Sequence, residues 1–206
     1  MELSAKGAYR TQKIAEVLKL AKILTESLIA DKVISSDEAI IISYGLENLM
    51  GNLLCLFVMI AIGGIFDHFA DSFFVWLLAF PLRKYAGGFH AKTKARCLVL
   101  SIGMIFCAYA IFFLFEWTIL EMFLAMLAPF MVIFFLAPVG SPNKPLDKLE
   151  YKVYRKKARG ILMLEGVLLC VAIVFQWKGL VIAITISFFM VGISVFAGKI
   201  IYLNKW

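Results

Sequence analysis

The sequence predicts an all-α integral membrane protein with about six transmembrane helices and an N-terminal amphipathic helix at the membrane surface. The chain of 206 residues is 63% hydrophobic and only 17% charged, whereas soluble domains are nearer half apolar. Apolar runs of about 17 residues or more, long enough to cross a bilayer, recur along it. The length suits one helical bundle and leaves no room for a second globular domain.

We expect residues 1–38 to be a cytoplasmic amphipathic segment, followed by a membrane domain over residues 39–206. One face of the expected N-terminal helix is apolar and charged residues occupy the others, as is typical of a helix lying on a membrane. The apolar residues are Ile14, Val17, Leu18, Ala21, Leu24 and Leu28. Ser35 and Glu38 form a capping-box pattern just before an apolar run, which predicts the start of the first membrane helix.

Six apolar segments predict the membrane spans. They are residues 39–66, 72–89, 97–115, 118–139, 160–176 and 179–199. The second is the weakest, because only residues 73–82 are strongly apolar and because Pro81 and Gly87-Gly88 disfavour a helix. It is either a short helix that unwinds or a re-entrant segment. Irregular backbone at membrane depth requires cover by protein or water, as in a membrane active site.

Basic residues fall almost entirely on one side of these spans. All of the 21 Lys and Arg residues except Lys178 lie in the N-terminal segment, the 83–96 loop, the 141–159 loop or the C-terminal tail. The positive-inside rule then places both termini and both basic loops in the cytoplasm of a multi-pass protein. The cytoplasm is reducing, so a cysteine in these loops stays a thiol.

The first basic loop ends in a cysteine that has charged neighbours. Cys97 lies where the loop becomes the third span, and the free N–H groups of that helix start, with Lys94 and Arg96 nearby, favour a thiolate. His90 is a candidate base or ion-pair partner for it, and a candidate proton donor to a leaving amine. The other cysteines fall inside apolar runs, where we expect them to pack as small hydrophobes: Cys55, Cys107 and Cys170.

A Cys–His pair makes a demand on the backbone between the two residues. On one unbroken helix, residues seven apart rise by about 10 Å, whereas a catalytic pair needs contact at about 3 Å. His90 must therefore lie on a turn that folds back, for which Gly87 and Gly88 supply the freedom. Other roles stay open for both residues. Cys97 could be a packing residue or a palmitoylation site, and His90 could be a hydrogen-bonded polar residue at the membrane interface. We expect no metal and no cofactor, because two soft ligands without a third are a weak zinc signal.

The two basic loops together carry twelve Lys and Arg residues, including Lys92, Lys94, Lys144, Lys156 and Lys157. This charge either fixes topology and meets anionic membrane lipid, or attracts an acidic partner. We expect no nucleic-acid partner, since no nucleic-acid-binding fold accompanies the charge.

Glu47 is an acid inside the first span, on a polar stripe of that helix. Acids within a membrane are costly and usually face the bundle interior. Glu47 either orients His90, holds a substrate backbone or pairs with Arg83, or else belongs to a polar stripe that joins helices.

The same residues resemble a known family. The segment "RKYAGGFHAKTKARC", with Arg83, Gly87-Gly88, His90 and Cys97, resembles the accessory gene regulator B (AgrB-type) family. So do "PVGSPNKP" at 138–145, "YGLE" at 44–47 and the span pattern, so that nearly the whole chain is covered. The resemblance implies a cysteine endopeptidase of quorum sensing in the bacterial cell membrane, with His90 and Cys97 as its catalytic residues.

The resemblance also implies a substrate, which is a short precursor peptide with an amphipathic N-terminal helix and an acidic C-terminal tail. The cysteine removes the tail and keeps the rest as a thioester, and an internal Cys or Ser of the peptide then closes a thiolactone or lactone ring. The tail would meet Arg83 and the loop lysines. Glu47, with Asn143 behind it, is the expected orienter of His90. Backbone N–H groups at the start of the third span, that of Cys97 included, are the expected oxyanion hole.

Two other functions fit the same sequence. A small peptide or ion transporter would use Glu47, Arg83 and a broken second span as its translocation site. A non-catalytic membrane scaffold would recruit an acidic partner through the basic loops. A bundle of this size also suits a homodimer.

Overall fold

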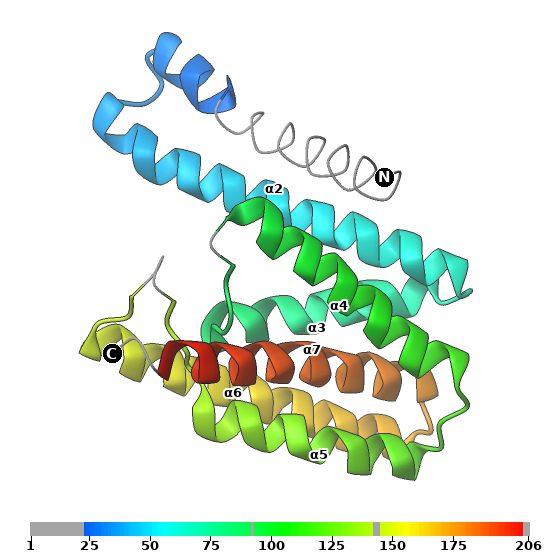
Figure 1. Ribbon diagram of the computed structural model, residues 1–206. Coiled ribbons are helices and arrows are strands. Elements are labelled where there is room, and N and C mark those ends of the chain that lie inside the picture. The colour runs from blue at the N-terminus through cyan, green and yellow to red at the C-terminus, as the bar shows by residue number, and fades with distance from the viewer. Residues whose placement is uncertain (1–22, 92, 142–144, 204–206) are drawn as a thin grey trace, which may run out of the picture.

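A computed structural model of the chain describes residues 23–91, 93–141 and 145–203, with backbone only for residues 36, 37, 94, 95 and 203 (Figure 1). A helix over residues 23–30 precedes six longer helices. These are α2 (Ser36–Ile65), α3 (Phe69–Ala86), α4 (Lys94–Leu114), α5 (Ile119–Leu136), α6 (Lys148–Val174) and α7 (Lys178–Leu203). The prediction of an all-α membrane protein is confirmed. Most of the expected N-terminal amphipathic helix lies outside the described residues.

Capping boxes fix where three of these helices begin. At α2 the N–H of Glu38 donates to Ser35 Oγ at 3.4 Å, and the N–H of Ser35 donates to the Glu38 carboxylate at 2.9 Å. The capping box predicted for these two residues is therefore confirmed. Equivalent boxes begin α5 and α6, formed by Thr118 with Glu121 and by Asp147 with Glu150.

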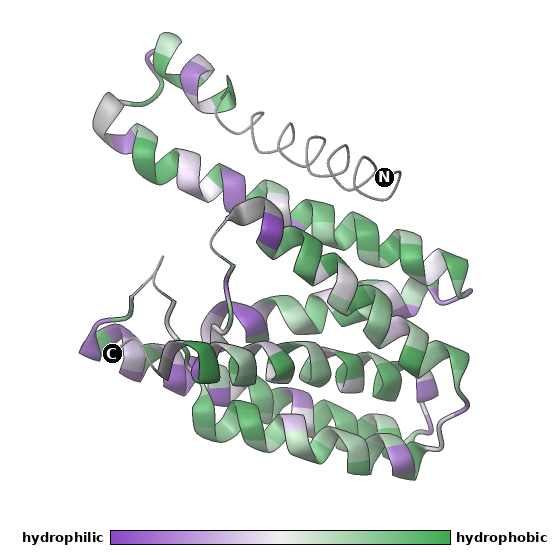
Figure 2. Ribbon diagram, viewed as in Figure 1, coloured by the Kyte–Doolittle hydropathy of each residue, from purple (hydrophilic) through white to green (hydrophobic). Residues whose placement is uncertain are grey.

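α7 is the central helix of the bundle and contacts α3, α4, α5 and α6 (Figure 1). It is apolar on nearly every side, as expected for a helix that is buried all round. Its buried side chains include Ile184, Ile186 and Phe188. The other helices turn apolar side chains outward, such as Phe57, and Figure 2 shows these hydrophobic stretches along α2, α4 and α5. In a membrane protein this surface faces lipid.

Among the described residues, four helices are long and apolar enough to cross a membrane. They are Glu38–Ile65, Arg96–Leu114, Ile119–Leu136 and Lys178–Tyr202. These correspond to the first, third, fourth and sixth predicted spans. The predicted count of six is not confirmed, because α3 and α6 carry more charge. α3 contains Asp71 near its start and Arg83 and Lys84 in its last turn.

α3 resolves the form of the second predicted span. It is a continuous helix of 18 residues that passes through Pro81. The chain leaves the helix at Gly87 and Gly88, whose φ angles of 67° and 123° favour glycine. The helix covers Phe69–Ala86, slightly ahead of the predicted 72–89.

The prediction of a loop over 141–159 is wrong from Lys148 onward. Those charged residues form the first turns of α6, for which Asp147 is the N-cap. Lys, Arg and Glu are good helix formers, and this local preference holds outside the apolar part of the bundle. Arg159 Nε donates to the carbonyl of Phe134 at 3.1 Å and so ties α6 to the end of α5.

Candidate active site

The site is built on the turn that follows α3. The N–H of Gly88 donates to the Val139 carbonyl at 3.1 Å, and the N–H of Val139 donates to the Ala86 carbonyl at 2.9 Å. The turn is thus paired with the chain just after α5. A β-carbon on Gly87 would collide with the Val139 carbonyl, and one on Gly88 would come within 2.8 Å of the Ser194 backbone on α7. Both positions therefore require glycine for space as well as for φ.

Arg83 holds the same turn from inside α3. Its guanidinium donates one hydrogen bond to the carbonyl of Gly87 and another, at 2.8 Å, to the carbonyl of Phe89. The forked shape of the group suits two acceptors placed side by side. Arg83 was predicted to meet the acidic tail of a substrate. Here these two donors are engaged by the turn that carries His90.

The turn brings His90 to Cys97. Thr93 is the N-cap of α4, and Cys97 lies in the first turn of that helix. Nδ1 of His90 and Sγ of Cys97 are 3.8 Å apart. The backbone therefore folds back between the two residues, as a Cys–His pair requires, and residues 87–91 and 93 are not helical.

The electrostatics favour a neutral imidazole. The His90 side chain reaches the surface, but part of its ring is buried. This burial, together with the positive charge of Arg83, lowers the pKa of His90 from 6.5 to about 4. At neutral pH the ring can therefore accept a proton from the Cys97 thiol. The distance of 3.8 Å is longer than a catalytic hydrogen bond of about 3 Å.

Comparison with known proteins gives the family. The family model described as accessory gene regulator B matches residues 18–196, including His90 and Cys97. This chain belongs to the accessory gene regulator B family. A protein of Clostridium perfringens (strain SM101 / Type A) named as AgrB-like is 27% identical over 152 residues, which cover 70% of this chain and 71% of that protein. A second AgrB-like protein, from Clostridium perfringens (strain 13 / Type A), is 26% identical with the same coverage. No solved structure matches.

Membership of the accessory gene regulator B family associates the chain with the processing of autoinducer peptides.

The remaining predicted site residues can be placed against the His90–Cys97 pair. Glu47 is half-buried on α2, and the structure describes no hydrogen bond between it and His90. Its role stays a prediction. Within the described residues, no group of three or more His, Cys, Asp and Glu side chains could hold a metal.

Basic side chains of this AgrB-family chain gather beside the end of α3. Lys84 Nζ lies 5.6 Å and Lys157 Nζ 5.0 Å from the ring centre of Tyr85. Lys156 is exposed next to Lys157 on α6. The two helices thus place part of the predicted positive surface near the site. Lys92 and Lys144, which were predicted to belong to this surface, lie outside the described residues, and so does the side chain of Lys94. Asn143, which was predicted to stand behind Glu47, also lies outside them.

One expectation about the oxyanion hole is wrong in this structure. The N–H of Cys97 donates to the Thr93 carbonyl at 3.0 Å, and the N–H of Arg96 donates to Thr93 Oγ1 at 3.3 Å. These two groups are engaged inside α4. The first two residues of a helix have no intrahelical acceptor for their N–H groups, so Lys94 and Ala95 are the better candidates.

Residues of α7 contact the site, although the sequence did not predict that they would. The Phe89 N–H donates to the Ser194 carbonyl at 2.8 Å, and the Tyr202 hydroxyl bonds the backbone of His90. Ser194, Gly198 and Tyr202 are spaced by four, which places them on one helix face. The spacing by four is the sequence signal that could have identified this face. It is hard to recognise because the helix is apolar almost throughout.

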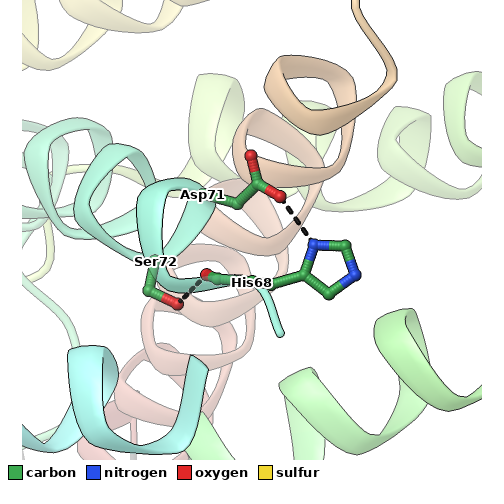
Figure 3. Close-up of polar contacts among 3 residues, drawn as sticks. All are labelled: His68, Asp71 and Ser72. Atoms are coloured by element: carbon green, nitrogen blue, oxygen red, sulfur yellow. Dashed lines mark hydrogen bonds and ion pairs between the residues drawn. The ribbon is translucent and has the colours of Figure 1, made fainter. Parts of the chain in front are cut away.

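A second polar cluster lies at the opposite end of α3. Nδ1 of His68 is 2.7 Å from the Asp71 carboxylate, and Ser72 Oγ donates to the His68 carbonyl (Figure 3). The His68 ring stacks on Phe113 with 4.0 Å between centroids. The cluster borders a pocket of about 250 Å³ that Trp117 also lines. The 18 residues of α3 separate it from the His90 turn by about 27 Å, so it belongs to the other end of the bundle.

Proposed function

We propose that this chain is a membrane-embedded cysteine endopeptidase that removes the acidic C-terminal tail of a short quorum-sensing precursor peptide. The remaining peptide, held as a thioester, then cyclises to a thiolactone or lactone autoinducer. The observation that carries the proposal is the 3.8 Å approach of His90 Nδ1 to Cys97 Sγ. Membership of a family linked to autoinducer peptides supports the class of substrate.

The first half of the reaction uses the pair as base and nucleophile. Neutral His90 takes the thiol proton of Cys97 at Nδ1, and the sulfur attacks the carbonyl carbon of the scissile peptide bond. Negative charge develops on the carbonyl oxygen, which accepts hydrogen bonds from the N–H groups of Lys94 and Ala95. The C–N bond then breaks. The protonated ring of His90 gives its proton to the departing amine, and the acyl group stays on Cys97 as a thioester.

The second half releases the peptide. An internal Cys thiol or Ser hydroxyl of the peptide loses its proton to His90 and attacks the thioester carbon. A new C–S or C–O bond closes the ring, the bond to Cys97 Sγ breaks, and that sulfur recovers the proton. The outcome depends on slow hydrolysis of the thioester, which a site partly shielded from water favours.

Charge and location account for the choice of substrate. Lys84 and Lys157 lie together around Tyr85, near the turn that carries His90, and give an acidic tail a favourable landing surface. A helix start next to apolar membrane helices also suits a substrate helix that lies at the lipid surface. With the basic surface facing the cytoplasm of a bacterial cell membrane, both termini are cytoplasmic. We also propose that two copies of the chain form a homodimer.

Co-expression with a short neighbouring reading frame tests the function. We expect that frame to encode an amphipathic helix, one internal Cys or Ser, and an acidic end. Mass spectrometry of the products should show the released tail and the cyclic peptide for the wild type. Neither product should form with Cys97→Ala or with His90→Ala.

Cysteines away from the turn supply matched controls. Cys107 lies on the same helix as Cys97 and Cys170 lies on α6, both with exposed side chains. Cys107→Ala and Cys170→Ala should leave the products unchanged. Full tail release by Cys97→Ala would contradict the proposal.

Two observations disfavour the competing transport function. It required a broken second span and an Arg83 available to a transported species. α3 is continuous, and two donors of Arg83 bond the carbonyls of Gly87 and Phe89.

A further inference from the structure

One face of α7 follows the backbone of the turn that carries His90. Ser194, Gly198 and Tyr202 are spaced by four and so lie in a row along the helix. The Ser194 carbonyl accepts the Phe89 N–H at 2.8 Å. Gly198 comes so close that a β-carbon there would lie 2.6 Å from the Phe89 nitrogen. The turn therefore rests directly on α7, with no side chain between them at Gly198.

Tyr202 makes the contact with His90 itself. Its hydroxyl accepts a hydrogen bond from the His90 N–H and donates one to the His90 carbonyl, both at 2.9 Å. A phenol can do both at once because its oxygen is a donor and an acceptor. The tyrosine is buried, and its ring stacks on Phe89 with 6.4 Å between centroids. The hydroxyl is thus held in one place and satisfies both backbone groups of His90.

We propose that Tyr202 is the positioning residue for His90, fixing the backbone from which the imidazole reaches Cys97. This inference rests on the proposed peptidase function. His90 follows two glycines and precedes α4, so no regular helix fixes its backbone. Without the phenol hydroxyl, the remaining backbone constraints act on Gly87, Gly88 and Phe89 rather than on His90. They come from Arg83, Val139 and Ser194. His90 would then be free to move relative to the sulfur.

Tyr202→Phe tests this directly because it removes the hydroxyl and keeps the ring. Misplacing a reacting group by about 1 Å can cost on the order of 100-fold in rate. We expect kcat to fall about 10- to 100-fold, with KM nearly unchanged because Tyr202 does not touch the peptide. Gly198→Ala should lower kcat in the same way, since the added methyl group displaces Phe89.

Two substitutions of the same kind serve as controls. Tyr109→Phe alters another fully buried tyrosine, which packs on Phe113 near the other end of α4. Gly103→Ala adds a methyl group where no atom lies within 4 Å. Both should keep wild-type kcat. Thermal melting in detergent should show that all four variants remain folded.

A readout that needs no activity separates this inference from the proposed function. The chain has only two histidines, so His68→Gln leaves His90 as the one imidazole signal in an NMR titration of labelled protein. Burial and Arg83 keep the His90 pKa low. If Tyr202→Phe lets the ring move towards water and away from Arg83, its titration should move up towards the ordinary value near 6.5.

The outcomes are distinct. A raised His90 titration together with a lower kcat supports the inference, and a raised titration in a chain that never cleaves peptide supports it while refuting the peptidase. An unchanged titration in folded Tyr202→Phe overturns it, whatever the activity. So does a loss confined to KM, which would make Tyr202 a substrate contact.

Discussion

The guanidinium of Arg83 donates a hydrogen bond of 2.8 Å to the carbonyl of Phe89, the residue just before His90. The last turn of α3 therefore fixes the position of the turn that carries His90 and also places a positive charge near the imidazole. These two effects of one side chain can be separated by mutation.

Arg83→Lys should keep the charge and lose the forked hydrogen bonds. Bonds from a charged group to a carbonyl typically contribute about 1.5–3 kcal/mol, so we expect lower thermal stability and a lower kcat. The acid limb of the pH profile should stay in place. Arg83→Gln removes the charge as well, so the His90 pKa should rise and the acid limb should move to higher pH. Identical acid limbs for the two variants would argue against the electrostatic role.

The wild type should keep its activity in mildly acidic solution. His90 acts as a base only when neutral, and its pKa is lowered from 6.5 to about 4. As pH falls, kcat/KM should therefore hold through pH 6 and decline as the pH approaches the lowered value. A limb centred near 6.5 would contradict a pKa lowered by partial burial of the ring and by the positive charge of Arg83. His68→Gln, at the far end of α3, should leave the profile unchanged.

The same shift predicts how stability depends on pH. The unfolded chain binds a proton at His90 below pH 6.5, whereas the folded chain resists it until about pH 4. The contribution of His90 is therefore fully present above 6.5 and is lost as the pH falls through that interval. Melting curves of wild type and His90→Ala should converge at low pH. A stability difference between the two proteins that stays constant from pH 6.5 to about 4 would refute this dependence on His90.

Gly88→Val should abolish cleavage without unfolding the bundle. Its φ of 123° is strained for any residue with a β-carbon, at a cost of about 1–3 kcal/mol. The added carbon would also meet the Ser194 backbone at 2.8 Å. We expect at least about a 100-fold loss of kcat with helical circular dichroism retained. Gly45→Val, at a site with open space, is the control. Retained cleavage in Gly88→Val would show that His90 does not need this turn.

Lys157→Gln should weaken binding of an acidic-tailed peptide. Exposed ion pairs contribute up to about 1 kcal/mol, so KM should rise by about 2- to 5-fold at low salt. The difference should fade as salt is added, because exposed charges are screened. Lys178→Gln, at the opposite end of the bundle, should not change KM. A KM that is independent of both salt and Lys157 would remove this surface from substrate binding.

Local signals in the sequence predicted the features that depend on a few neighbouring residues. The Ser35–Glu38 capping box predicted the start of α2, because the two residues satisfy each other's backbone groups. The glycine pair predicted the turn after α3, because few other residues adopt positive φ. The spacing of His90 and Cys97 required that turn, and the structure brings the two side chains together.

Features that depend on packing between distant segments were not predicted. Two donors of Arg83 are engaged by carbonyls of the turn that follows α3, which the sequence of a basic segment does not reveal. The Cys97 N–H is engaged because α4 begins at Lys94 rather than at the cysteine. The row of Ser194, Gly198 and Tyr202 is inconspicuous in an apolar helix, since its meaning comes from a backbone more than 100 residues earlier.

The contact between Tyr202 and His90 joins residues that are 112 positions apart, with the tyrosine in the last turns of the final described helix. His90 and Cys97 are therefore synthesised long before α7, the helix whose Tyr202 holds the backbone of His90. Under the proposed function, His90 and Cys97 become aligned only after α7 has been made and has packed against the turn that carries His90.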